Sequence, residues 1–336
     1  MLKTLLAGVA GAALLAVAPA SAQIQNRNIR VSNGVNQDHP NGKGVEVMAK
    51  CAADKSGGKI KITGFWGGAL GGDLQAAQAL RSGTQEMVVT STSPLVGILP
   101  EIGVFDLPFL ISSEKEADQL LDGEFGKFIS DKMPAVGLVN LAYWENGFRN
   151  ATNSKQPIKK WEDFQGVKMR VMQNPIFLDT FKNMGANAVP MNFGEVFAAL
   201  ETRTIDGQEN PFVTIETSKM NEVQKYLSVT RHAYTPFMVL FSKKIWDGYS
   251  PEEQKVLSDC ALAARDVQRQ TNRELNAKSF ASLREKGMQV NELAEAEIGR
   301  MREQAKPIYD KHAATIGKET VDKAMAELKR IRGATN

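Results

Sequence analysis

The sequence predicts an α/β fold of two lobes joined by one long helix, and three observations support this. Helical and strand-like patterns alternate along the chain, as is typical of α/β proteins. Removing the leader described below from the 336 residues leaves 314, which is more than one hydrophobic core comfortably organises. The segment from Ser250 to Gly287 has no glycine or proline in its interior, which predicts a single helix.

The ends of this long helix are marked by local signals. Ser250 is a suitable N-cap, Pro251 suits the first helical position, and Glu253 completes a capping box. Gly287 is a natural terminator. At 1.5 Å per residue the helix is about 55 Å long. A lobe of this size is only about 30–40 Å across. The helix is therefore expected to run along both lobes.

The remaining elements are shorter. Period-two alternation or short apolar runs predict six strands: Ile29–Ser32, Lys59–Thr63, Glu86–Thr90, Leu138–Trp144, Val167–Val171 and Phe237–Phe241. Helices are predicted at Gly44–Ala53, from the glycine-rich turn Gly67–Asp73 to Leu80, and from the capping residue Asn192 to Leu200. The charged tail Glu292–Arg332 is predicted to form two amphipathic surface helices.

Residues 1–22 have the features of a secretory signal peptide: Lys3, the apolar run Leu5–Val17 and the small-residue site Ala20–Ala22. A membrane anchor is the alternative, but the apolar run is short for a span and no polar stop-transfer flank follows it. The 41 basic and 38 acidic side chains nearly cancel, and no basic stripe is present, which argues against a nucleic-acid partner. We therefore expect an exported protein whose selectivity comes from a local site.

The chain contains two cysteines, Cys51 and Cys260, each on a predicted helix among apolar neighbours. They are either two buried small hydrophobic residues or a disulfide, since an exported protein enters an oxidising compartment. No metal site is expected, because His39, His232 and His312 are widely separated and no ligand spacing surrounds them. No cofactor motif is found either.

The candidate ligand-binding residues are two arginines and an asparagine. Arg170 lies near the carboxyl end of a predicted strand, on the face opposite Met169, and open α/β sheets bind ligands at that end. Arg149 follows the strand that ends near Trp144, and could reach the same crevice. Asn210 ends a short polar segment before Pro211. A planar guanidinium suits a carboxylate, although either arginine could instead form a structural ion pair.

Several motifs in combination give the chain a family resemblance: Ala69–Asp73, Gly147–Thr152, Gly166–Val171, Pro190–Glu195 and Ile205–Pro211. The chain resembles the substrate-binding proteins of tripartite ATP-independent periplasmic (TRAP) transporters, of the dicarboxylate-binding DctP type, from Ile29 to about Ile331. The resemblance implies a periplasmic location and a type II-like, two-lobed periplasmic binding protein fold. Its implied division is 23–146 plus 236–275 for lobe I and 147–235 plus 276–336 for lobe II.

The resemblance also implies a site. Arg170 makes the main ion pair to a substrate carboxylate, Arg149 and Asn210 support it, and Phe193 packs on the substrate. Sialic-acid members carry a Glu after the strand that corresponds to Glu86–Thr90, and none stands here. The further expected ligand contacts are Asn36, His39, Ser91, Glu145, Asn146, Gln173 and Glu209. Because this rim has many neutral hydrogen-bonding groups and some acids, a sugar acid such as glucuronate or galacturonate is expected.

The resemblance implies a small organic acid and the membrane permease subunits as partners, and a monomer is expected. A receptor for C4-dicarboxylates and a receptor of an ATP-driven importer are the alternatives. An enzyme is not expected, because no Ser-His, Cys-His or metal constellation is found in the sequence.

Overall fold

A computed structural model describes residues 23–334, so the predicted signal peptide lies outside the described residues. Within that range one sheet of nine strands has the order β2-β1-β3-β8-β4-β7-β5-β6, with β9 paired to β8. The strands are β1 (Arg27–Asn33), β2 (Ile60–Phe65), β3 (Met87–Ser91), β4 (Leu138–Asn153), β5 (Lys168–Val171), β6 (Asn187–Pro190), β7 (Gly207–Asn210), β8 (Tyr226–Ser242) and β9 (Gln289–Glu292).

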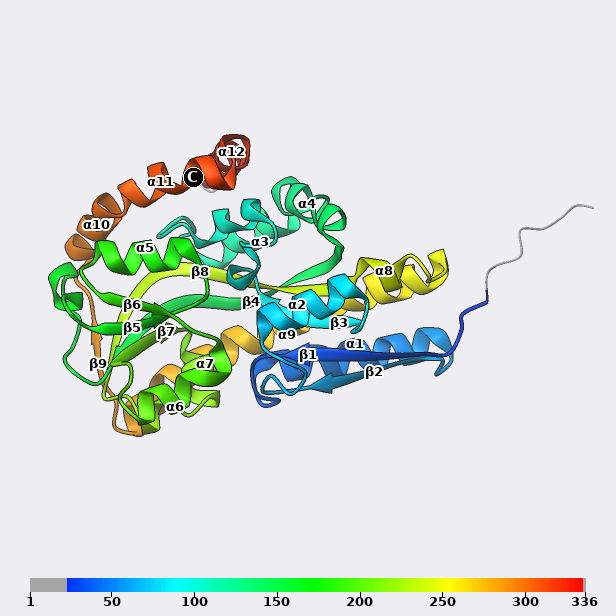
Figure 1. Ribbon diagram of the computed structural model, residues 1–336, viewed down its shortest axis with the longest axis horizontal. Coiled ribbons are helices and arrows are strands. Elements are labelled where there is room, and N and C mark those ends of the chain that lie inside the picture. Colours follow the sequence, from blue (N-terminus) through cyan, green and yellow to red (C-terminus); the bar gives the residue numbers. More distant parts are fainter. Residues whose placement is uncertain (1–22, 335–336) are drawn as a thin grey trace, which may run out of the picture.

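Helices cover this sheet on both lobes (Figure 1). They are α1 (Pro40–Ser56), α2 (Asp73–Ser82), α3 (Glu114–Asp122), α4 (Glu124–Ser130), α5 (Pro175–Asn183), α6 (Val196–Glu201), α7 (Phe212–Thr217), α8 (Lys243–Trp246), α9 (Pro251–Glu285), α10 (Glu295–Gln304), α11 (Lys306–Ile316) and α12 (Lys318–Gly333). Short 3-10 helices are η1 (Ser93–Leu95), η2 (Pro100–Asp106), η3 (Met133–Val136), η4 (Trp161–Phe164), η5 (Phe193–Glu195) and η6 (Met220–Glu222). We call the part built on β1, β2, β3, α1 and α2 lobe I, and the part built on β5, β6, β7 and α5–α7 lobe II.

The two long strands β4 and β8 pass from one lobe to the other and pair antiparallel. The sequence predicted only a part of each strand, Leu138–Trp144 of β4 and Phe237–Phe241 of β8. Strand β4 continues past Trp144 because a bulge between Glu145 and Gly147 bends the ladder without ending it, and Gly147 takes a φ of 117° there. Arg149 therefore lies inside a strand, and not in a loop after one.

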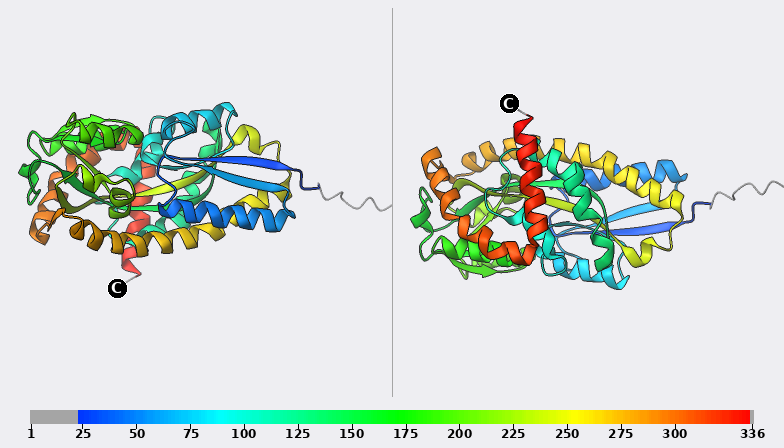
Figure 2. Two further views of the ribbon diagram at one scale, coloured as in Figure 1. Left: turned by 90° about the horizontal axis from the view of Figure 1, so that it is seen from below. Right: turned by 90° about the horizontal axis from the view of Figure 1, so that it is seen from above.

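The predicted long helix is confirmed as α9. Ser250 is its N-cap, its hydroxyl accepts from the Glu253 amide at 3.2 Å, and Pro251 occupies the first turn. The helix packs on α1 of lobe I, on the strand β4 that passes between the lobes, and on α7 of lobe II. Figure 2 shows it, in yellow to orange, along the long dimension of the molecule past both lobes. One rigid element thus supports both sides of the sheet.

The tail differs from the prediction. It forms three helices, α10 to α12, within the described residues instead of two, because Pro307 begins a new helix in α11 and Gly317, with a φ of 94°, separates α11 from α12. Helix α12 packs against α3 and α4, which the predicted division assigns to lobe I. That division remains a prediction.

Cys51 on α1 and Cys260 on α9 form a disulfide with a Cα–Cα distance of 5.6 Å. The bond joins two helices that pack side by side over the core of lobe I. Within residues 23–334, no helix combines the length and apolar character needed to cross a membrane.

Candidate ligand-binding site

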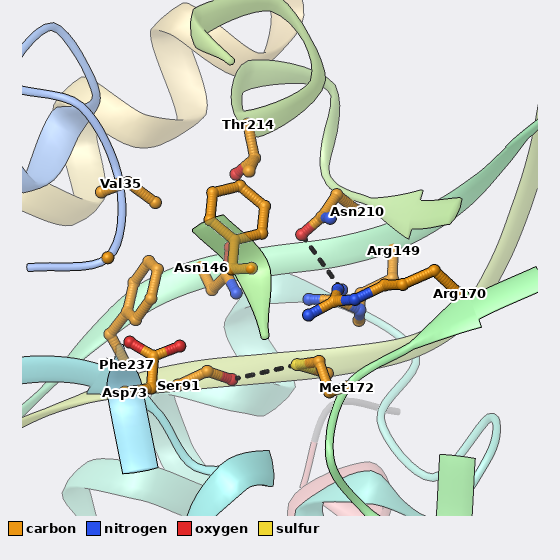
Figure 3. A pocket seen from close by; sticks show the side chains of 12 residues that line it. Val35, Asp73, Ser91, Asn146, Arg149, Arg170, Met172, Asn210, Thr214 and Phe237 are labelled. Carbon is orange, nitrogen blue, oxygen red and sulfur yellow. Dashed lines mark hydrogen bonds between the residues drawn. The ribbon is translucent and has the colours of Figure 1, made fainter. Parts of the chain in front are cut away.

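A cavity lined by both polar and apolar side chains lies between the lobes, at the carboxyl ends of β3, β5 and β7. It has a volume of about 380 Å³, its opening to solvent included. Its lining residues are Gly34, Val35, Asp73, Ser91, Asn146, Arg149, Arg170, Met172, Phe193, Asn210, Thr214 and Phe237. Figure 3 shows Arg149, Arg170 and Asn210 together on one side and Val35, Asp73 and Phe237 on the other. We call this space the inner cavity.

Arg170 is buried at the carboxyl end of β5, and its guanidinium is only partly hydrogen-bonded. Its Nε and Nη2 donate to the carbonyl oxygen of Met191, at 3.0 and 2.7 Å. Its Nη1 is buried without a hydrogen-bond partner, and no carboxylate within residues 23–334 lies within 4.0 Å of the guanidinium. Burial lowers the pKa of Arg170 to about 10, so the group is still charged at neutral pH.

Arg149 is also fully buried, but its charge is balanced by protein. Its Nε and Nη2 bond to the carboxylate of Glu209, and Nη2 also donates to the Glu209 carbonyl at 2.6 Å. Nη1 donates to the Thr235 hydroxyl at 3.2 Å. Burial alone would raise the pKa of Glu209, but Arg149 and the His232 ring outweigh burial and lower it.

Asp73 lines the inner cavity and was not among the predicted contacts. It begins α2, directly after the glycine turn, where the helix N-terminus favours a negative charge. Burial raises the pKa of this carboxyl, while the Thr90 hydroxyl and Arg170 oppose the rise. The motif Ala69–Asp73 contains the residue, but the turn gave no indication of where its side chain points. Asp73 adds a hydrogen-bond acceptor on the side facing Arg170.

The remaining polar groups of the inner cavity are neutral. Asn210 accepts from Arg149 Nη2 at 3.0 Å and donates to Gln208 at 2.6 Å. Asn146 donates its Nδ2 to the Thr235 hydroxyl at 3.3 Å, and its Oδ1 is buried without a partner. An acceptor buried without a partner is costly unless a ligand satisfies it.

Contacts across the cleft show that the lobes are closed. Asn36 of lobe I donates to the Thr217 carbonyl of lobe II at 3.0 Å. The His39 ring lies 3.3 Å from the Thr214 hydroxyl, and burial lowers the pKa of His39 to about 3. His39 is therefore neutral and serves as the N-cap of α1.

The predicted contacts fall into two groups. Those brought together around the inner cavity are Arg170, Arg149, Asn210, Phe193, Ser91 and Asn146. Those that do not line it are Asn36, His39, Glu145, Gln173 and Glu209.

Each of the second group has a physical reason to be elsewhere. Glu145 is buried against Arg273 Nη2 at 2.7 Å and the Tyr234 hydroxyl at 3.2 Å. Glu209 is saturated by Arg149 and His232. Gln173 is exposed and does not line the inner cavity. His39 and Asn36 bond across the cleft, as described above. No group of His, Cys, Asp and Glu within residues 23–334 is arranged to hold a metal ion.

Comparison with known proteins matches residues 31–315 to the family model of bacterial extracellular solute-binding proteins, family 7, called DctP. The chain belongs to this family. It is 46% identical, with a TM-score of 0.90, to the sugar acid binding protein DctPAm of Advenella mimigardefordensis, solved in complex with galactonate, over 92% of this chain and 99% of that one.

Two curated relatives widen the range of substrates within the family. The 2,3-diketo-L-gulonate-binding periplasmic protein YiaO of Escherichia coli is 38% identical over 70% of this chain and 72% of its own. The C4-dicarboxylate-binding periplasmic protein DctP of Rhodobacter capsulatus is 30% identical over 87% of this chain and 88% of its own length. These findings confirm the TRAP-type resemblance, the two-lobed α/β fold and the role of solute receptor. The family consists of binding proteins, not catalysts.

Proposed function

We propose that this TRAP receptor binds a hydroxylated monocarboxylate, a sugar acid, in the inner cavity. The observation that carries the proposal is the pair formed by Arg170 and Asp73. Arg170 offers a buried N–H without a protein acceptor, and Asp73 offers a carboxylate on the other side of the same space (Figure 3). One end of the ligand is thus an anion and the other end donates hydrogen bonds.

The charges in the inner cavity favour a single negative charge on the ligand. Glu209 neutralises Arg149, so Arg170 is the cation that has no carboxylate partner among the lining residues. A second carboxylate, as in a C4-dicarboxylate, meets Asp73, and like charges at close range in a poorly solvated site repel. A sugar hydroxyl instead donates to Asp73 with a charge-assisted hydrogen bond.

Neutral groups supply further partners for hydroxyls. The free Oδ1 of Asn146 accepts, and the hydroxyls of Ser91 and Thr214 can donate or accept. Phe193 and Phe237 provide apolar surface for the carbon chain. The galactonate bound to DctPAm and the diketogulonate named for YiaO are acids of this class.

The mechanism we propose is hinge closure. The carboxylate binds Arg170 on lobe II, and contacts with Asp73 and Ser91 on lobe I favour the closed form. The bulge between Glu145 and Gly147 lies where β4 passes between the lobes, at the predicted boundary, and is the proposed hinge. The receptor then delivers the acid to the TRAP permease subunits in the periplasm, as a monomer without a cofactor and without catalysis.

Calorimetry on ligand-stripped protein tests the substrate class. The panel contains galactonate, gluconate, galacturonate, glucuronate, malate and succinate. At least one sugar acid is expected to bind in the micromolar range, about 8 kcal/mol of binding free energy. Tight binding of succinate together with no response to any sugar acid contradicts the proposal.

A further inference from the structure

A second hollow shares part of its wall with the inner cavity. We call it the outer groove; its volume is about 690 Å³, open solvent included. Its lining residues are Gly34, Asn36, Gly67, Phe193, Gly194, Phe197, Ser218, Lys219 and Met220. Its walls come from both lobes, so it exists in this form only when the lobes are closed. It offers two aromatic rings, a thioether, amide and hydroxyl groups, and one exposed lysine.

The two spaces share two lining residues, Gly34 and Phe193. Gly34 has no side chain, so the ring of Phe193 is the one shared side chain that stands between them. The ring lies 5.9 Å from the Arg170 guanidinium and packs against the core of lobe I as well as the core beneath α6 and α7. It therefore touches both lobes at the seam.

The backbone that carries this ring is held in place. Asn192 caps η5, with its Oδ1 accepting from the Gly194 amide at 3.0 Å. The Asn192 side chain also lies so close to Gly72 of lobe I that a Cβ there would stand 1.7 Å from Nδ2. This contact restrains the backbone beside Phe193 against lobe I.

We infer that Phe193 sets the length limit of the ligand, by separating the inner cavity from the outer groove. This inference rests on the proposed function of the inner cavity. Under the proposed function a single sugar acid occupies the inner side of the ring. A sugar acid that carries a second, neutral sugar ring needs the outer groove, where the Phe197 ring and Met220 provide an apolar surface and Asn36 and Ser218 provide polar groups. With the phenyl ring present that extension is blocked.

Matched pairs of acids test the inference by calorimetry. Gluconate is compared with lactobionate, which is gluconate bearing a galactose, and galacturonate is compared with galacturonosyl-rhamnose, in which the added sugar is also neutral. The wild type is expected to bind the longer acid of each pair at least about 100-fold more weakly than the shorter acid. In Phe193→Ala the longer acid of the better-bound pair gains about tenfold or more. The shorter acid weakens by about tenfold, because its apolar contact with the ring is lost.

Two further variants separate a steric barrier from a general structural role. Phe193→Leu keeps an apolar barrier, so it is expected to restore the affinity for the shorter acid without admitting the longer one. Phe197→Ala, which alters the outer groove alone, is expected to leave the shorter acid unaffected. When added to Phe193→Ala, it is expected to reverse the gain for the longer acid.

The outcomes are distinguishable from a failure of the proposed function. If the wild type binds no sugar acid, the proposed function is wrong and this inference falls with it. If the wild type binds the shorter acid and Phe193→Ala, folded by its melting curve, shows no gain for the longer one, only this inference is wrong. Equal binding of both acids to the wild type also contradicts it.

Discussion

Arg149 and Arg170 line the same cavity from two strands of one sheet, and both are buried, yet their surroundings differ. Arg149 meets a carboxylate, two further oxygens of Glu209 and Asn210, and the Thr235 hydroxyl. Arg170 meets one carbonyl oxygen and retains an N–H without a partner. A buried charge whose partners all come from the protein contributes to the fold, and under the proposed function the ligand supplies the partner that Arg170 lacks.

The contrast extends to the acids around the cleft. Glu209 is next to a cation and its pKa is lowered, despite its complete burial. Asp106 and Asp73 have no bonded cation, and burial raises the pKa of each. A bonded cation, and not burial alone, decides whether the pKa of a buried acid is lowered or raised.

The largest effect is expected from breaking the saturated pair. Glu209→Ala leaves Arg149 buried without its carboxylate and is expected to lower the unfolding free energy by about 3–5 kcal/mol, measured by urea denaturation. Glu162→Ala is the matched control, because Glu162 pairs with Arg300 at the surface and its loss should change stability far less. Equal losses in the two variants would show that the Arg149 pair contributes no more than a surface pair.

A pH-dependent effect is expected next, at Asp106. Its carboxylate accepts from Ser93 and from Asn174 at 2.7 Å, and burial raises its pKa to about 7. Because the folded pKa is raised, the stabilising contribution is fully present below about pH 4 and is lost as the pH rises through 7. The unfolding free energy is expected to fall by on the order of 2–4 kcal/mol across this pH range because of Asp106.

Asp106→Asn does not titrate, so it provides the reference for this effect. Between pH 4 and 8 the variant is expected to become progressively more stable relative to the wild type, measured by denaturation at each pH. A stability difference that does not change with pH would mean that Asp106 titrates normally in the fold.

A smaller effect is expected at Asp73, where one substitution should weaken ligand binding and at the same time stabilise the ligand-free protein. Asp73→Asn removes the charged acceptor and should weaken the sugar acid by about 1.5–3 kcal/mol of binding free energy, measured by calorimetry. The ligand-free variant should melt at a higher temperature at pH 7, because the raised pKa shows that the ionised carboxyl is disfavoured in the fold.

The gain in melting temperature should shrink as the pH falls through the raised pKa toward the ordinary value of Asp, where the wild-type carboxyl is protonated in both states. If succinate binding improves in Asp73→Asn while sugar-acid binding is unchanged, Asp73 excludes dicarboxylates without holding hydroxyls.

Local signals in the sequence were sufficient for some features. The capping box at Ser250 and the uninterrupted run to Gly287 predicted α9 to within two residues at its C-terminal end. The alternation around Arg170 predicted a strand with this side chain near its carboxyl end, but it left a structural ion pair open, and the family resemblance was needed to expect Arg170 in the cleft. The signals for the ends of α9 and for the strand that carries Arg170 each come from residues within a few positions in the chain.

Other features depend on pairings between distant segments. Glu209 reaches Arg149 because β7 pairs antiparallel with β4, with Ala151 opposite Glu209, and no local pattern encodes that register. Glu145 meets Arg273, 128 positions along the chain, because helix α9 packs on β4. The direction of Asp73 depends on a turn containing Gly67, Gly68 and Gly71, all at positive φ, whose path the sequence leaves open.

Arg170→Ala tests the central claim most directly, with calorimetry and thermal melting on the same ligand-stripped preparation. We expect no measurable binding of the sugar acid that the wild type binds, because the buried cation that receives the carboxylate is gone. We also expect a melting temperature close to that of the wild type, because Arg170 completes no ion pair within the described fold. Retained binding with a large fall in melting temperature would contradict the account, since Arg170 would then stabilise the fold and not the ligand.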